Sequence, residues 1–361
     1  MSATLPEFPW DTLTEARAVA EAHPDGIVDL SVGTPVDPVA PLIREALASA
    51  SASPGYPTTA GTPKLRQSMV AALGRRYGVT GLSEAAVLPV IGTKELIAWL
   101  PTLLGLGSAD LVVVPELAYP TYEVGARLAG ARVLRADSLT QVGPEAPALV
   151  YLNSPSNPTG RVLGVDHLRK VVFWARERGA LVVSDECYLG LGWDTEPLSL
   201  LHPSVCDGDH TGLLAAHSLS KSSSLAGYRA GFVAGDAQLV AELLAVRKHA
   251  GMMVPTPVQA AMVAALDDDA HEHEQRKRYA RRRAMLLPAF RSAGFTAEHS
   301  EAGLYLWVTR GQPCRDTVEW LAQRGILTAP GEFYGPAGAG HVRVALTATD
   351  ERIAAAVDRL T

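Results

Sequence analysis

Short runs of apolar, mostly β-branched residues alternate with longer stretches of helical period between residues 87 and 250. The apolar runs are continuous rather than interrupted by polar residues, which is typical of parallel strands buried on both faces of a sheet. The predicted strands are 87–91, 111–114, 133–136, 148–152, 181–184, 213–217 and 231–235. The predicted helices between them are 93–104, 119–130, 165–178 and 236–250. This alternation predicts an α/β fold in which helices sandwich a mostly parallel, seven-stranded sheet.

The two ends of the chain follow a different pattern. Residues 1–40 are spotted with proline and show no periodicity, whereas 267–291 form one long helical stretch. Two short strands and a last helix are expected after it, at 304–308, 342–345 and 350–360. We therefore expect a large domain over residues 41–270, and a smaller α+β domain built from both termini, 1–40 and 271–361.

Composition and charge exclude several classes of protein. With 361 residues, 47% of them hydrophobic and 19% charged, the chain is typical of a globular protein and not of a disordered one. The net charge of −6 argues against a nucleic-acid binder. No run approaches the ~18 apolar residues that cross a bilayer, and the first residues lack the features of a signal peptide. Cys187, Cys206 and Cys314 show no metal-like spacing, so a reducing, cytoplasmic compartment is expected.

Polar side chains follow the predicted strands, at the end of a parallel sheet where binding groups gather. One strand runs into a loop that presents Ser218, Ser220, Lys221 and, further on, Arg229. A lysine amine that is partly desolvated there has a lowered pKa and can attack an aldehyde. Serine hydroxyls beside an arginine suit a phosphate dianion. The alternative, a solvated loop lysine, stays open on these residues alone.

Three further strand ends carry candidate chemistry. Asn157 lies in a turn and can donate to an anionic oxygen. Asp185 ends a buried strand, where a carboxylate needs a partner such as a protonated pyridine nitrogen. Tyr188, three residues further on, can donate a hydrogen bond to a phenolate-like oxygen. Gly92 and Thr93 begin a helix whose backbone amides form an anion site. Each residue also has an ordinary structural interpretation, as a turn, a helix cap or a helix start.

Together these residues supply what pyridoxal 5′-phosphate requires: an amine for its aldehyde, a partner for its ring nitrogen, donors to its ring oxygen and a phosphate cradle. In their order and spacing the chain resembles the fold-type I, class I/II aminotransferase family. Asn157 precedes Asp185 by 28 residues, Lys221 follows after 36 more, and Arg229 after another 8. The resemblance implies a PLP-dependent transamination in which Lys221, Asp185 and Tyr188 are catalytic.

The resemblance extends over nearly the whole chain and implies roles for further residues. Tyr56 would reach the cofactor phosphate of a neighbouring subunit, which implies a homodimer, and Tyr119 would stack on the pyridine ring. Arg343 would pair with the substrate α-carboxylate, near the N-terminal segment at Gly33. The implied cofactor set is Tyr56, Gly92, Thr93, Lys94, Tyr119, Asn157, Asp185, Tyr188, Ser218, Ser220, Lys221 and Arg229. The implied substrate set is Gly33, Asn157 and Arg343.

At finer grain the chain resembles actinobacterial-type N-succinyldiaminopimelate aminotransferases, in its stretches SVGTPVDPVAP, GTKELIAWLP and DDDAHEHEQRKRYARRRAML. This implies that glutamate donates the amino group and that N-succinyl-2-amino-6-oxopimelate accepts it, in lysine and diaminopimelate biosynthesis. Ala302 stands where relatives often carry glycine, and we expect it to narrow the substrate mouth.

Several alternatives remain. The chain could be another amino-acid aminotransferase or a carbon–sulfur lyase on the same fold. An effector module of a transcription regulator is disfavoured, because only some 30 residues precede the first matched motif.

The charged stretch that begins at Asp267 could be interpreted as a metal cluster followed by a nucleic-acid patch. Acidic residues at the start of a helix and basic ones further along instead suit the helix dipole and form i,i+4 pairs. We therefore expect neither a metal nor a nucleic-acid partner. The expected partners are small amino and 2-oxo acids.

Overall fold

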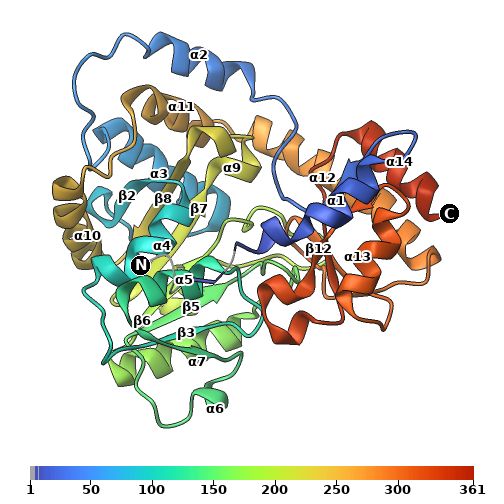
Figure 1. Cartoon of the computed structure of the whole chain (residues 1–361). Helices are drawn as coiled ribbons and strands as arrows, with labels where there is room; N and C mark the ends of the chain where they lie inside the picture. Colours follow the sequence, from blue (N-terminus) through green and yellow to red (C-terminus); the bar gives the residue numbers. More distant parts are fainter. Residues whose placement is uncertain (1–4, 7) are drawn as a thin grey trace.

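The computed structural model describes residues 5, 6 and 8–361, so the first four residues of the predicted small domain, and its residue 7, lie outside the described residues. The largest sheet of the described residues has seven strands and forms the middle layer of the large helix-covered part of the molecule (Figure 1). In spatial order the strands are β2 (Val87–Ile91), β8 (Ala230–Gly235), β7 (Leu213–Ser218), β6 (Leu181–Asp185), β5 (Leu149–Asn153), β3 (Leu111–Val114) and β4 (Arg132–Arg135). β8 runs antiparallel to both neighbours and the other strands are parallel to one another. The predicted fold class is confirmed.

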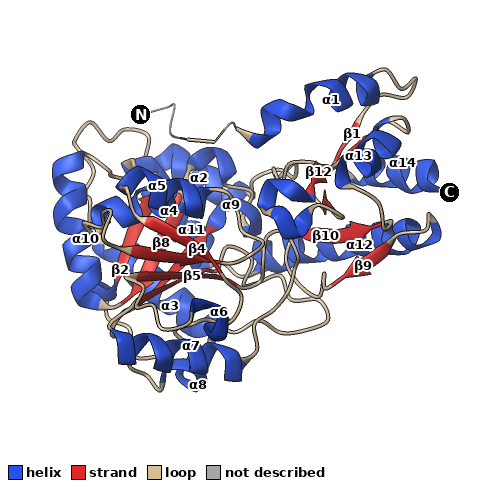
Figure 2. Cartoon of the chain, turned by 60° about the horizontal axis from the view of Figure 1, so that its bottom comes forward, coloured by secondary structure: helices blue, strands red, loops and turns tan. Residues whose placement is uncertain are grey.

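Helices cover both faces of this sheet (Figure 2). One face carries α4 (Thr93–Leu103), α5 (Thr121–Ala129) and α10 (Ala237–Ala250). The other carries α3 (Pro63–Tyr77), α7 (Val165–Arg178) and α11 (Thr256–Asp267), with α2 (Pro41–Ser49) packed on α11. Three short helices complete this part: α6 (Leu139–Val142), α8 (Pro203–Cys206) and α9 (Leu219–Ser222).

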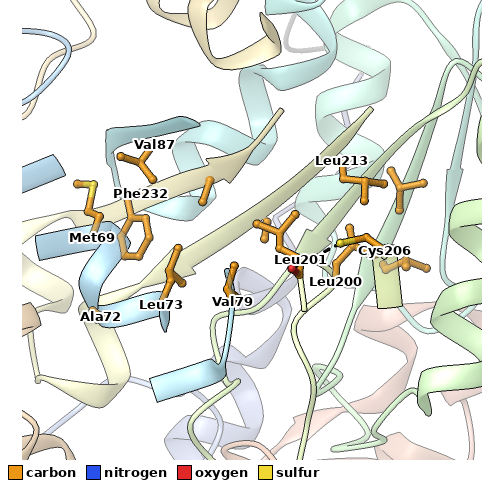
Figure 3. Packing of buried hydrophobic residues seen from close by; sticks show 14 of the residues in the cluster. Met69, Ala72, Leu73, Val79, Val87, Leu200, Leu201, Cys206, Leu213 and Phe232 are labelled. Carbon is orange, nitrogen blue, oxygen red and sulfur yellow. Dashed lines mark hydrogen bonds between the residues drawn. The ribbon is translucent and has the colours of Figure 1, made fainter. Parts of the chain in front are cut away.

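The two helical layers bury alternate residues of each strand. Val182 belongs to the core on the α7 side and Val183 to the core on the α4 side, because successive side chains of a strand point to opposite faces. In the first of these cores, Phe232 of β8 packs beside Met69 and Leu73 of α3 (Figure 3). Burial on both faces explains why the strands appear in the sequence as continuous apolar runs.

Segments from both ends of the chain pack around a further core, separate from the two that flank the central sheet. β1 (Val28–Asp29) pairs in parallel with β11 (Ile326–Leu327). An antiparallel sheet has the order β12 (Ala329–Pro330), β13 (Val342–Ala345), β10 (Tyr305–Thr309) and β9 (Thr296–Glu298). Its helices are α1 (Thr14–Glu21), α12 (Ala270–Ser292), α13 (Cys314–Ala322) and α14 (Asp350–Leu360). The domain limits at residues 40 and 270 stay a prediction.

Short 3₁₀ helices lie at Pro9–Leu13, Glu84–Ala86, Ala226–Tyr228, Gly331–Tyr334 and Pro336–Gly338. No helix among the described residues is long and apolar enough to cross a membrane.

The sequence pattern missed some helices. The expectation that residues 1–40 lack periodic structure is wrong over α1, and α2, α3 and α11 were not predicted. α2 and α3 begin at prolines, which fit the first turn of a helix but break an apolar period. α11 is rich in alanine, which gives little contrast between its faces. The long helix expected from residue 267 begins at Ala270, because the backbone of Asp268 is extended and separates α11 from α12.

Candidate active site

A cavity of about 220 Å³ opens at the carboxyl-terminal ends of the parallel strands. The neighbouring strands β5, β6 and β7 each end beside it, so the polar residues that follow them lie together although they are far apart in sequence. The predicted site residues that line it are Gly33, Thr93, Lys94, Tyr119, Asn157, Asp185, Tyr188, Ser218, Ser220, Lys221, Arg229 and Arg343.

Lys221 lies on α9, the short helix that directly follows β7. Its amine donates a hydrogen bond to the backbone carbonyl of Gly33, which brings the N-terminal segment into the site. Burial lowers the pKa of Lys221, because a charged ammonium loses its hydration there. A larger share of neutral, nucleophilic amine near pH 7 follows, as an aldehyde-binding lysine needs.

Asp185 at the end of β6 is a buried carboxylate, and no basic side chain of the described residues lies within 4 Å of it. Its oxygens accept hydrogen bonds from the hydroxyl of Tyr122 at 2.9 Å and from the backbone amide of Cys187 at 3.2 Å. Burial raises the pKa of Asp185, and these hydrogen bonds offset part of that rise. A protonated pyridine nitrogen would supply the missing positive partner, so this residue fits the cofactor.

The start of α4 and the segment from the end of β7 to Arg229 form an anion cradle. Gly92 has φ of +80°, and a Cβ there would collide with the guanidinium of Arg229. That guanidinium donates to the carbonyl of Ala226 at 2.8 Å and has no carboxylate within 4 Å in the described part of the chain. With Ser218 and Ser220 at the same cavity, the donors suit a phosphate dianion.

Arg343 of β13 is a buried cation, only 2% exposed. It donates to the side-chain oxygen of Asn157 at 2.9 Å and to the carbonyl of Ser31 at 2.7 Å, and its guanidinium lies 3.9 Å from the ring centre of Tyr305. Its Nε has no hydrogen-bond partner, and no described carboxylate lies within 4 Å. Because an unpaired buried charge is costly, this arrangement favours an anionic ligand group.

Three predicted or expected residues do not line the cavity. Gly92 lies just behind it, at the start of α4. Tyr56 is 98% exposed in the loop between α2 and α3. Ala302 is fully buried and its backbone amide donates to the carbonyl of Gly160, so the expectation that it narrows the substrate mouth is wrong.

Lys94 lies between two aromatic rings at the cavity. Its amine is 5.5 Å from the ring centre of Phe8 and 5.7 Å from that of Tyr119. No carboxylate lies within 4 Å of it among the described residues. Lys94 therefore presents a positive charge that the aromatic faces orient and that no acidic side chain neutralises.

The sequence reasoning missed two tyrosines of the site. Tyr122, which bonds Asp185, stacks on Tyr151 with ring centres 5.0 Å apart. The hydroxyl of Tyr305 lies 3.1 Å from that of Tyr188. The position of Tyr122, one helical turn after Tyr119, could have indicated it, whereas nothing near Tyr305 in the sequence pointed to the site.

A metal centre is not seen in the described residues, which contain no group of three His, Cys, Asp or Glu side chains placed to hold an ion. The sulfur of Cys187 lies 3.1 Å from the hydroxyl of Thr93. Burial raises the pKa of this thiol, so it is held as an uncharged group at the edge of the cavity.

Comparisons with known proteins agree with this geometry. The sequence profile of aminotransferase class I and II matches residues 25–360. A probable aminotransferase of Mycobacterium tuberculosis is 82% identical over 361 residues, which are all of this chain and 86% of that protein. The 4-dedimethylamino-4-oxo-anhydrotetracycline transaminase of Streptomyces rimosus is 60% identical over 99% of both chains. The solved structure of a probable N-succinyldiaminopimelate aminotransferase from Thermus thermophilus has a TM-score of 0.88, with 29% identity, and the match covers 98% of this chain and 99% of that one.

Proposed function

We propose that this chain, which belongs to the class I and II aminotransferases, moves an amino group from glutamate to an acceptor with several carboxylates. The enzyme is a PLP-dependent aminotransferase, since that family uses pyridoxal 5′-phosphate. When bound, the cofactor supplies an aldehyde that carries the amino group and a ring that accepts the electron pair of the substrate α-carbon. The observation that carries the proposal is the convergence of Lys221, Asp185 and the buried Arg343 on one cavity.

The roles of the residues follow from their positions. Lys221 would be linked to the cofactor aldehyde and, once released, would move the proton between the substrate α-carbon and C4′ of the cofactor. Asp185 would keep the ring nitrogen protonated, while Asn157 and Tyr188 would hold the ring oxygen O3′. Tyr119 would stack on the ring. The phosphate would be held by the helix start at Gly92 and Thr93 and by Ser218, Ser220 and Arg229.

Two cations support an acidic substrate. Arg343, near Gly33 and Asn157, would bind the α-carboxylate that glutamate and every 2-oxo acid carry. Lys94, first expected in the phosphate set, would bind a distal carboxylate, because its amine faces the cavity without an acidic neighbour. N-succinyl-2-amino-6-oxopimelate has such carboxylates, and we propose it as the acceptor, with a place in lysine and diaminopimelate biosynthesis.

A second candidate acceptor is a bulky cyclic ketone. The relative that is 60% identical over almost its whole length is named as a transaminase of 4-dedimethylamino-4-oxo-anhydrotetracycline. Aromatic side chains of Trp10 and Tyr119 at this cavity would pack against such a ring system.

A panel of acceptors tests the substrate, with glutamate as donor and release of 2-oxoglutarate as the readout. The succinylated keto-diacid should react fastest, and Lys94→Ala should raise its KM at least ~10-fold while pyruvate is little affected. If the enzyme is inactive toward the succinylated acid but rapidly converts a small oxo acid or the cyclic ketone, N-succinyl-2-amino-6-oxopimelate is excluded as the acceptor. The proposal that the enzyme catalyses transamination would still hold. Release of ammonia and pyruvate from cystathionine would instead indicate the carbon–sulfur lyase.

Replacement of the proposed catalytic lysine tests the chemistry itself. Lys221→Ala should abolish turnover and the visible absorption band that borohydride removes, because no other amine takes its place. The matched control is Lys64→Ala, since Lys64 is an exposed lysine that pairs with Asp267. A Lys221→Ala enzyme that still transaminates would show that the assignment is wrong.

The remaining proposals concern assembly and location. We propose a homodimer, and the exposed aromatic side chain of Tyr56 supports it, because a subunit-bridging residue must point away from its own fold. We propose a cytoplasmic enzyme, which is supported by the absence of disulfides among the three cysteines of the described chain.

A further inference from the structure

A second cavity, of about 280 Å³, lies beside α9 and shares no lining residue with the aminotransferase site. Its walls come from the chain segment 38–44, from the residues after Lys221, and from the first turns of α12. Figure 1 shows α9 next to the start of α12, with α2 above them. The transamination proposed above uses none of the side chains in this cavity.

A serine, a histidine and an aspartate form a chain of hydrogen bonds at this cavity. Ser223 Oγ lies 2.8 Å from Nε2 of His271, and Nδ1 of His271 lies 2.7 Å from Oδ2 of Asp268. The carboxylate also accepts the backbone amide of His271 at 2.9 Å. Because a carboxylate at Nδ1 holds the proton on that nitrogen, Nε2 is left as the acceptor for the serine hydroxyl. This is the order of nucleophile, base and orienting acid that activates a serine.

The backbone next to the serine supplies a free donor. Ser224, directly after Ser223, has φ of 56°, in the left-handed region that non-glycine residues seldom adopt. Its amide donates to no group in the described part of the chain. An amide that follows the nucleophile is a position from which enzymes bind the negative oxygen formed when a carbonyl is attacked.

The charges of the cavity indicate the kind of substrate. Arg44 and Arg278 line it, and neither has a carboxylate within 4 Å among the described residues. Glu274 lines it as well, but its carboxylate is bonded to Lys277 at 2.7 Å. Two unpaired guanidinium groups favour a ligand that carries a carboxylate.

We propose that this cavity is a second catalytic site, at which Ser223 hydrolyses carboxylic esters that carry an additional carboxylate. Ser223 Oγ forms a bond to the carbonyl carbon and gives its proton to His271 Nε2. The bond from that carbon to the alcohol oxygen then breaks, and His271 returns the proton to the departing alcohol. Water next attacks the acyl group on Ser223, gives one proton to His271 and releases the acid, after which Ser223 regains its proton. Ester and water thus become acid and alcohol.

The test uses the PLP-loaded enzyme with 4-nitrophenyl hydrogen succinate as an anionic ester and 4-nitrophenyl butyrate as a neutral one. We expect the anionic ester to react faster by kcat/KM, and Ser223→Ala and His271→Ala to lower that rate at least ~100-fold. Arg278→Ala should remove most of the preference for the anionic ester. A fluorophosphonate probe should label Ser223, as peptide mass spectrometry would show.

The matched control is Ser222→Ala, which removes the adjacent serine of the same cavity. Ser222 Oγ lies 3.4 Å from Ser223 Oγ, a long contact beside the 2.8 Å between Ser223 and His271, and it does not contact His271 itself. It should keep both the labelling and the hydrolysis. Transamination by each variant reports on folding, because Ser223 and His271 lie outside the aminotransferase cavity. This readout also separates failure of the hydrolase proposal from failure of the transaminase proposal.

The proposal is overturned if the wild-type enzyme is not labelled at Ser223, or if Ser223→Ala hydrolyses the anionic ester as fast as the wild type. In that case the three side chains serve to fasten the start of α12 to α9. Should Ser223→Ala fail to fold, Asp268→Asn decides the question, since it keeps the shape of the side chain and should still lower hydrolysis at least ~100-fold.

Discussion

Asp185 and Glu186 are neighbours in the chain but belong to different environments. Asp185 faces the cavity of Lys221, whereas Glu186 lines a small cavity of about 30 Å³ together with Tyr77 and His217. One oxygen of Glu186 accepts the amide of Leu200 at 2.7 Å, and its other oxygen lies 3.6 Å from Nε2 of His217 without a hydrogen bond. The two adjacent acids thus lie at different cavities, because the side chains of successive residues of a strand point to opposite faces of the sheet.

Burial sets the protonation states of Glu186 and His217. It raises the pKa of Glu186 to about 7 and lowers the pKa of His217 to about 3. Near pH 6 the folded protein therefore keeps a proton on the carboxyl and a neutral imidazole, which avoids two charges in a water-poor site.

The raised pKa of Glu186 predicts how the substitution Glu186→Gln changes the pH dependence of the free energy of unfolding. Between pH 4.5 and about 7 the folded wild type binds more protons at this residue than the unfolded chain, so stability is lost as the pH rises through that window. Glutamine does not titrate, so the variant should gain up to about 3 kcal/mol relative to the wild type between pH 5 and pH 8. Urea unfolding at the two pH values measures this difference. A difference that does not change with pH would contradict the burial argument.

At the scale of elements, the position of α4 matters most for the site, because its first turn supplies Thr93 and Lys94. A buried ion pair holds this helix against α10. The guanidinium of Arg247 is fully buried and donates to both oxygens of Glu95, each at 3.0 Å. The pair fixes the register of the two helices, since a bidentate contact allows one geometry.

Removal of the Glu95 carboxylate should therefore lower the free energy of unfolding. Glu95→Ala leaves Arg247 buried without its partner and should destabilise the fold by about 3–5 kcal/mol in urea unfolding. The same substitution at Glu145, whose contact with Arg132 is about half exposed, should cost at most ~1 kcal/mol. Equal effects of the two substitutions would show that burial does not decide the strength of these pairs.

At the scale of the whole molecule, the position of Tyr56 has no explanation within one chain, since its side chain is exposed, belongs to none of the three cores described above and lies outside the cavity of Lys221. If it completes the site of a second copy, each subunit carries one half of two sites. A hybrid dimer distinguishes this arrangement from a residue that acts within its own subunit.

Co-expression of differently tagged Lys221→Ala and Tyr56→Ala subunits provides that hybrid. Each homodimer should be impaired, the second through weaker cofactor binding. The hybrid should regain about half the wild-type activity, because one of its two sites combines both native residues. A hybrid no more active than its better parent, or a wild-type enzyme that sediments as a monomer, would contradict the bridging role.

The sequence alone located most of the sheet and the residues that follow its strands. The strands β2, β3 and β13 and the helices α7 and α14 begin and end where the pattern predicted. Among the other strands of the central sheet, β4 and β5 are shifted by one residue at both ends, and β6, β7 and β8 are one residue longer than predicted. Asp185 could be found because it ends an apolar run, and Lys221 because it lies in the polar segment that comes within a few residues of another. Parallel strands bring their carboxyl ends to one edge, so order along the chain already implied proximity in space.

Contacts between distant segments were decided only by the tertiary structure. The hydrogen bonds of Arg343 to Asn157 and of Lys221 to Gly33, and the chain from Ser223 through His271, each join residues that no local period connects. A hydrophobic period records which face of an element is buried but not which element covers it. That choice depends on how whole layers pack, so these side-chain partners became visible only once the layers were in place.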